Sequence, residues 1–150
     1  MKRILAIFVL TAFTVVFVSC KKSNDGNGKT KTELLTQASW KFDKATASGF
    51  GDISSQLPSC KKDDIITFSS NNTGVADEGA TKCNAGDPQA TNFNWNFLSN
   101  ETVLHLSVVL FSGGSSDFNI VSLTETNLVL SQVMNVSPFG NTTVEVTFKH

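Results

Sequence analysis

The strict alternation of side chains at residues 92–97, which read Asn-Phe-Asn-Trp-Asn-Phe, constrains the fold of this chain most. Successive side chains of a β-strand point to opposite faces, so this segment predicts a strand with one aromatic face and one amide face. The same period of two recurs at residues 64–69, 103–111 and 142–148. Aromatic strand faces are buried against one another, so we expect β-strands packed around a common core.

Turn-forming residues separate these segments at short intervals. Examples are residues 71–74 (Asn-Asn-Thr-Gly) and the glycine pair at 113–114. About eight strands fit between the turns, and no segment is long enough for the helix of a parallel crossover. The sequence predicts an all-β fold, an antiparallel eight-stranded barrel, with a β-sandwich as the alternative. A short helix over residues 32–37, capped by Thr32, is expected ahead of the first strand.

The N-terminal segment has the layout of an export signal. Two basic residues precede an apolar run over residues 4–18, which is shorter than the ~20 residues that a membrane-spanning helix needs. Residues 17–20, Phe-Val-Ser-Cys, resemble the lipobox that lipoprotein signal peptidase cuts. We predict a lipoprotein signal peptide at residues 1–19 and acylation of Cys20 with chains such as palmitate. An ordinary signal peptide with a chance cysteine is the alternative.

The segment after Cys20 carries nothing that a core could bury. Residues 21–31 are polar and rich in lysine, so residues 20–32 are predicted to be the lipidated cysteine and a flexible tether. The β domain would then span residues 33–150. Acyl chains on Cys20 would anchor the protein to a membrane. We therefore expect a cell-envelope location, at the outer membrane, with the domain facing the periplasm or the cell surface.

Lipidation of Cys20 leaves two cysteines in the exported domain. An even pair in an exported protein predicts a disulfide, here between Cys60 and Cys83. Free buried thiols are the alternative. A zinc site is disfavoured because the second closely spaced ligand pair of such sites is missing.

Charge and polar side chains argue against several classes of function. The chain has a formal net charge of −1, and its one arginine, Arg3, lies in the signal peptide, so nucleic acid is not an expected partner. His105 is expected on an outward strand face as a surface residue, and His150 is expected to be disordered. No catalytic triad or Cys/His set occurs at a recognisable spacing. We expect no catalytic residues, no cofactor and no enzymatic activity.

Two acidic pairs raise the question of a metal. The carboxylates of Asp63-Asp64 and Asp77-Glu78 are hard oxygen ligands that suit calcium. However, Lys61 and Lys62 stand beside the first pair, and no Asp-x-Asp-x-Asp loop occurs. The sequence favours solvated loop charges and no metal site.

Several motifs follow one another in a fixed order through residues 34–149. A short helix leads to Trp40, and then come residues 60–68 (Cys-Lys-Lys-Asp-Asp-Ile-Ile-Thr-Phe), the 71–74 turn, Cys83, the aromatic strand around Trp95, a strand of alternating leucines and a final strand ending Thr-Phe-Lys. This order resembles the lipocalin-like domains common in lipoproteins of Bacteroidetes. The resemblance implies a lipocalin-like barrel whose closed end is plugged by Trp40. In lipocalins an arginine of the last strand covers that tryptophan, and Lys149 is the basic residue suitably placed here.

The inward-facing side chains are predicted to line a ligand cavity or to fill the core: Trp40, Phe42, Ile66, Phe68, Phe93, Trp95, Phe97, Leu104, Leu106, Val144, Val146 and Phe148. In the first hypothesis, the domain binds a small hydrophobic molecule among the aromatic residues. In the second, the barrel is filled, and the domain is a structural or protein-interaction module of the envelope that uses the 48–59 and 80–90 loops. Either way, a monomer is expected.

Overall fold

The structure, a computed structural model, describes residues 28–150 and begins with a short helix, α1 (Lys31–Thr36). Thr30 caps this helix, because its Oγ1 accepts a hydrogen bond from the Glu33 N–H at 3.1 Å while the Glu33 carboxylate accepts one from the Thr30 N–H at 2.7 Å. This reciprocal capping box explains why the expected cap at Thr32 is wrong. The predicted signal peptide, the lipobox and Cys20 lie outside the described residues.

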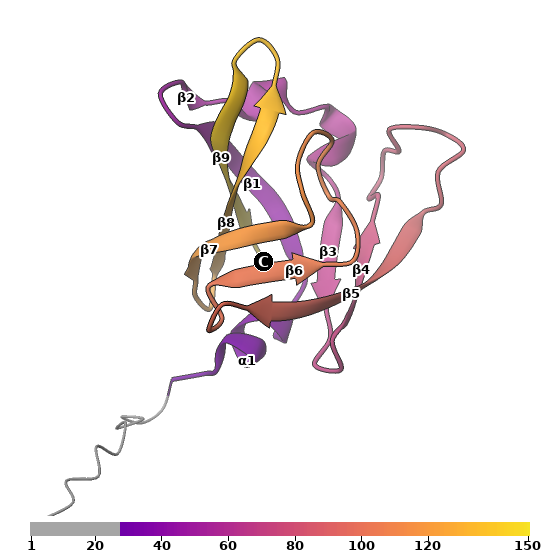
Figure 1. The fold of residues 1–150 in the computed structure, drawn as a ribbon. Helices are drawn as coiled ribbons and strands as arrows, with labels where there is room; N and C mark the ends of the chain where they lie inside the picture. Colours follow the sequence, from indigo (N-terminus) through magenta and orange to yellow (C-terminus); the bar gives the residue numbers. More distant parts are fainter. Residues whose placement is uncertain (1–27) are drawn as a thin grey trace, which may run out of the picture.

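Nine antiparallel strands make up the rest of the described chain (Figure 1). They are β1 (Trp40–Ala47), β2 (Gly51–Asp52), β3 (Ile65–Phe68), β4 (Thr73–Asp77), β5 (Ala90–Leu98), β6 (Val103–Leu106), β7 (Asp117–Leu123), β8 (Asn127–Val136) and β9 (Gly140–Lys149), with two short 3-10 helices, η1 (Ser54–Gln56) and η2 (Ser59–Lys61). β9 returns to pair with β1, and the two-residue β2 stands beside β1 outside the ring. Eight strands therefore close a barrel, and the predicted fold is confirmed.

A β-bulge in β1 decides which of its side chains enter the barrel. Register against β9 shifts between Phe42 and Lys44. An extra residue reverses the alternation of a strand, so Ala45 and Ala47 point inward instead of Lys44. Beyond the bulge, the residues of β1 that face the interior of the barrel are therefore alanines.

Aromatic rings fill the barrel around β3, β4 and β5. Phe68 meets Phe93 and Trp95 edge to face, with ring centroids 5.5 and 5.8 Å apart. The Trp95 indole N–H donates to the carbonyls of Ser69 and Thr73, so its polar atom is satisfied. Gly74 faces this cluster, and a Cβ there would lie 2.3 Å from the Phe93 ring. The packing leaves no room for a side chain at this position.

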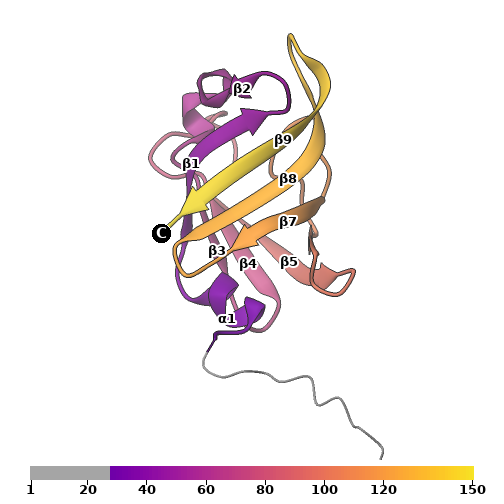
Figure 2. The same ribbon diagram turned by 90° about the vertical axis from the view of Figure 1, so that its left-hand side faces the viewer.

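Helix α1 lies at one end of the barrel (Figure 2). Trp40 packs at this end. It is fully buried, and its indole N–H donates to the Leu35 carbonyl at 2.8 Å, which holds the helix against the barrel. His150 packs on its ring with centroids 3.9 Å apart, and His150 Nδ1 lies 2.9 Å from the Ser39 carbonyl oxygen. The expectation of a disordered His150 is therefore wrong. Lys149 does not cover Trp40, because strand alternation turns it outward, where it pairs with Asp43 at 3.1 Å.

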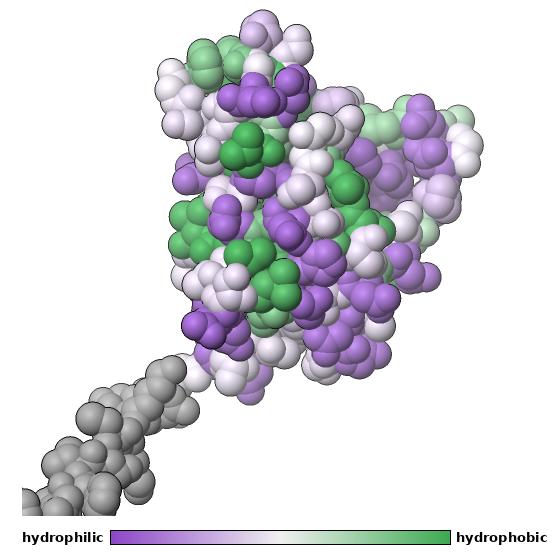
Figure 3. All heavy atoms as spheres, in the orientation of Figure 1, coloured by the Kyte–Doolittle hydropathy of each residue, from purple (hydrophilic) through white to green (hydrophobic). Residues whose placement is uncertain are grey.

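Apolar residues on the outside of the barrel are scattered. Figure 3 shows them as separate patches among polar residues on one face of the molecule. The most exposed are Phe50, Val109, Val121 and Val133. No helix within residues 28–150 is long and apolar enough to cross a membrane.

Candidate functional site

A cavity of about 470 Å³ is lined by residues of η1, η2, β8 and β9. The 3-10 segment and the β8–β9 turn lie at the end of the barrel opposite α1 (Figures 1 and 2). The size of the cavity falls within the range of pockets that hold small molecules. Three segments supply most of its lining: the η1–η2 segment, the loop between β6 and β7, and the paired strands β8 and β9. They contribute a mainly apolar lining of Ile53, Leu57, Leu110, Phe111, Met134, Val136, Val144 and Val146.

Inward side chains on the β1–β9 pair become smaller towards this end of the barrel. Across the β1–β9 pair, Ala45 lies opposite Val146 and Ala47 lies opposite Val144. All four are buried. Alanine and valine fill far less of the interior than the Trp and Phe rings at the other end, so space remains above the aromatic core.

Ten of the twelve residues predicted to face inward do not line this cavity. The structure places eight of them in the buried core, with the other two, Phe42 and Phe97, partly buried against it. Only Val144 and Val146 border the cavity. The aromatic side chains are thus gathered in the filled part of the barrel, away from the hollow part.

Sequence reasoning missed most of the lining. Residues 103–111 are predicted as one strand, but β6 ends at Leu106, and the chain then folds over the end of the barrel. Phe111 reaches back into the interior, where its ring lies 6.4 Å from those of Phe118 and Phe148. Met134 had a usable signal, because it continues the inward alternation of Leu128 and Leu130 along β8.

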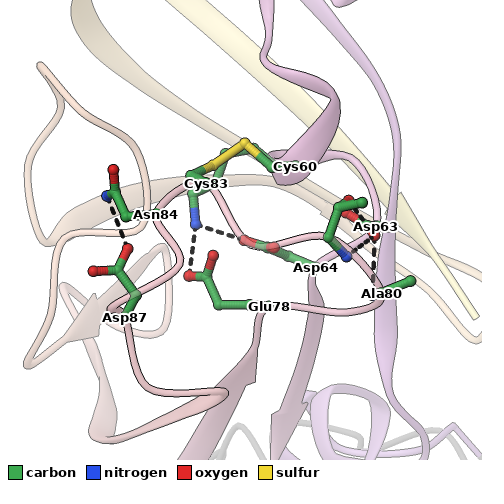
Figure 4. Close-up of a disulfide and its surroundings, with 10 residues drawn as sticks. Cys60, Asp63, Asp64, Glu78, Ala80, Cys83, Asn84 and Asp87 are labelled. Atoms are coloured by element: carbon green, nitrogen blue, oxygen red, sulfur yellow. Dashed lines mark hydrogen bonds and ion pairs between the residues drawn. A yellow bond between two sulfur atoms is a disulfide. The ribbon is translucent and has the colours of Figure 1, made fainter.

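A disulfide holds one side of the cavity (Figure 4). Cys60 and Cys83 are bonded, with their Cα atoms 5.2 Å apart, which confirms the predicted pairing. The bond joins η2 to the loop after β4, and Cys83 itself borders the cavity. The two loops named in the second hypothesis are therefore fixed to one another at this point.

Carboxylates next to the disulfide are engaged by protein groups. Lys61 Nζ lies 3.0 Å from Asp64 Oδ2 and 2.9 Å from Glu78 Oε1. Burial lowers the pKa of Lys61, but its hydrogen bonds to Glu78 and Asp64 outweigh this and leave the pKa raised. Burial raises the pKa of Asp64 against the opposing effect of Lys61. Lys61 is thus a charged lysine already shared between two acids.

The other acidic residues of these pairs hold the loops in place. Asp63 Oδ2 accepts hydrogen bonds from the Thr81 hydroxyl and from the backbone N–H groups of Ala80 and Thr81, and the Thr81 hydroxyl contributes most to lowering the pKa of Asp63. Asp77 Oδ1 accepts from the Gln89 amide and the Gly79 N–H, and these bonds lower its pKa. Among residues 28–150, no group of three or more His, Cys, Asp or Glu side chains is placed to hold a metal ion.

His105 lies on the outside of β6, away from the cavity lining. Its Nδ1 atom is 2.5 Å from Asp117 Oδ1 on the neighbouring strand β7, and both side chains are partly exposed. The pair joins two strands at the surface, in keeping with the prediction of a surface residue.

A model of a known protein family agrees with this architecture. The model of the lipocalin-like domain family matches residues 22–130, and the chain belongs to that family. Among solved structures, a complex of bovine odorant binding protein with a selenium-containing odorant is similar, at 14% identity and a TM-score of 0.42, over 85% of this chain and 76% of that chain. No curated protein matches the sequence.

Proposed function

We propose that this protein is a lipid-anchored lipoprotein of the cell envelope whose lipocalin-like domain binds a small hydrophobic molecule. The observation that carries the proposal is the apolar cavity of about 470 Å³ between β8, β9 and the 107–116 loop. A space of this size lined by Leu, Val, Met and Phe takes an apolar ligand out of water, which contributes roughly 25 cal/mol for each Å² buried. The binding unit is a monomer, since one barrel supplies the whole lining.

The position of the cavity suits an anchored domain. The described chain enters through α1 at the closed end of the barrel (Figure 2). An anchor at Cys20 would hold the closed end towards the membrane and leave the cavity facing away from it. Ligand exchange would then take place on the side of the domain that is open to solvent.

Dye binding tests the cavity directly. Full-length protein in lipid nanodiscs should bind the apolar dye N-phenyl-1-naphthylamine saturably above the background of empty nanodiscs. Val144→Phe places a ring in the cavity and should weaken this binding at least tenfold. The matched control is Val133→Phe, the same change on the outward face of β8, where Val133 is 64% exposed. Failure of the unmodified protein to bind the dye, or equal loss in both variants, would count against the proposal.

Acylation and membrane retention test the anchor. Cys20→Ala should abolish incorporation of labelled palmitate and release the protein from membranes, since stable retention depends on the acyl chains. Cys20→Ser is a closer isostere and should behave in the same way. Unchanged membrane retention in both variants would refute lipid anchoring while leaving the cavity proposal intact.

A second candidate function is protein interaction at the rim of the cavity. Phe50 is 53% exposed and stacks on Phe139 with ring centroids 4.3 Å apart. Phe50 lies in the β1–β2 turn, within the 48–59 loop, and Phe139 lies in the β8–β9 turn. Phe50→Ser should leave dye binding intact, and loss of an envelope partner in cross-linking would then favour this candidate.

A further inference from the structure

One buried polar side chain interrupts the apolar surroundings of the cavity. Gln132 lies on β8 with only 5% of its surface exposed. It stands opposite Val144 in the β8–β9 register and shares the inward row of β8 with Met134. Both neighbours line the cavity, so Gln132 lies next to the lining in the sheet, although it is not itself a lining residue.

The orientation of this amide is fixed by its partners. The Ser115 backbone N–H donates to Gln132 Oε1 at 2.7 Å, and the Ser115 hydroxyl lies 3.2 Å from the same oxygen. A backbone N–H can only donate, so the amide oxygen, and not the nitrogen, must face Ser115. Gly114 supports this arrangement, because a Cβ there would lie 2.7 Å from Gln132 Nε2.

With the oxygen engaged, the amide nitrogen is left without a hydrogen-bond partner among the described residues. Buried polar groups nearly always have partners, and an unpaired buried donor is costly. A donor that is held rigidly beside an apolar cavity, and that no protein group satisfies, is suited to an acceptor carried by a ligand.

The charged residues around the cavity indicate which hydrogen-bond acceptor a ligand would carry. Lys61 is the only charged residue of the lining, and Asp64 and Glu78 already pair with it. One cation between two carboxylates leaves a negative balance on this side. A carboxylate ligand would be desolvated there without a cation of its own, which is unfavourable. A neutral carbonyl oxygen accepts from an amide N–H without that cost.

We propose that Gln132 is a ligand-binding residue whose Nε2 group donates a hydrogen bond to the carbonyl oxygen of a neutral, otherwise apolar ligand such as a long-chain ketone or ester. This inference rests on the proposed function of the cavity and narrows its ligand class. Uncharged carbonyl compounds are preferred over both pure hydrocarbons and free fatty acids.

A double-mutant-type cycle, which combines two protein variants with two ligands, separates the contribution of this hydrogen bond to binding. Binding of 2-undecanone and undecane is measured by displacement of N-phenyl-1-naphthylamine from full-length protein in nanodiscs, for the unmodified protein and Gln132→Met. Each ligand partitions equally into the nanodiscs of both proteins, so this background cancels in the comparison. Gln132→Met should lower the preference for the ketone over the hydrocarbon about tenfold, with little change for undecane.

Gln56→Met is the matched control, because Gln56 borders the cavity and undergoes the same chemical change. It should alter the ketone preference by less than about twofold. Undecanoate should bind the unmodified protein more weakly than 2-undecanone. Equal preference in Gln132→Met and the unmodified protein, or tighter binding of undecanoate, would overturn the inference. Absence of dye binding to the unmodified protein would instead contradict the proposed function.

A second measurement covers the case in which Gln132→Met does not fold. The side-chain ¹⁵N–H₂ signals of Gln132 in the unmodified protein should shift on addition of 2-undecanone and not of undecane. Signals that respond equally to both ligands, or to neither while the dye is displaced, would show that the amide does not contact the carbonyl group.

Discussion

The two ends of the barrel are built from the same strands but from different side chains. At the end next to α1, Trp40, Phe68 and Trp95 are buried in the core, and the rings of Phe68 and Trp95 meet edge to face. At the opposite end, Val144 and Val146 of β9, which pair with alanines of β1, border a cavity of about 470 Å³. One fold thus combines a solid base, which stabilises it, with a hollow mouth, which is available for binding.

The ends also differ in what holds them together. The base depends on buried apolar area and on a few satisfied polar atoms, such as the Trp40 indole N–H bonded to Leu35. The mouth depends on a covalent bond, Cys60–Cys83, and on carboxylates that accept hydrogen bonds from loop backbone. Loops around a cavity bury too little apolar surface to order themselves, so crosslinks and charged hydrogen bonds replace packing there.

Truncation of an aromatic residue at each end tests this contrast most strongly. Trp40→Ala should destabilise the fold by about 3–5 kcal/mol, as a large ring is lost from a fully packed site. Phe111→Ala at the mouth should cost less than about 2 kcal/mol, since Phe111 already borders empty space. Urea unfolding monitored by circular dichroism gives both values. Similar costs at the two positions would show that the ends are packed alike.

Loss of the disulfide should weaken the mouth selectively. Cys60→Ser combined with Cys83→Ser should lower the free energy of unfolding by about 3 kcal/mol. Hydrogen exchange should become faster in the η1–η2 and 80–90 segments and stay slow around Trp40. The unmodified protein treated with a reductant serves as the control. Uniformly faster exchange, or two alkylatable thiols in the oxidised protein, would contradict this division of roles.

Acid should loosen the mouth through Asp63. Hydrogen bonds from Thr81 lower the folded-state pKa of Asp63 below its usual value of 3.8. A lowered folded pKa contributes stability above the unfolded pKa, and that stability is lost as the pH falls through the folded value. Asp63→Asn should therefore reduce the loss of stability below about pH 4. Asp43→Asn, a surface pair with Lys149, is the control, and an equal effect in both variants would refute a specific role for Asp63.

The barrel was predictable from the sequence because the alternation of apolar and polar residues is visible within each single strand. Alternation in β5 and β9 fixes which face is buried, and the even cysteine pair predicts the crosslink that the structure contains. The cavity was not predictable in the same way. Its lining comes largely from loop residues such as Leu57 and Phe111, and the bulge between Phe42 and Lys44 that turns alanines inward is not marked by composition or period.

Two further features depended on tertiary context. Residues 107–111 continue the strand pattern of β6, but they leave the sheet, and Phe111 packs, partly buried, near Phe118. His150 is ordered because Trp40 and Ser39 lie within its reach at the closed end. Neither partner is near in sequence, so local patterns contain no information about these contacts.

A crystal structure of the protein with bound N-phenyl-1-naphthylamine tests the central claim most directly. We predict the dye at the mouth, between Met134, Val144 and Leu110, with Trp40, Phe68 and Trp95 unchanged in position. Dye inserted among the aromatic rings of the base would contradict the division into a solid base and a hollow mouth. An empty cavity at the mouth in a crystal soaked with a saturating concentration of the dye would contradict it as well.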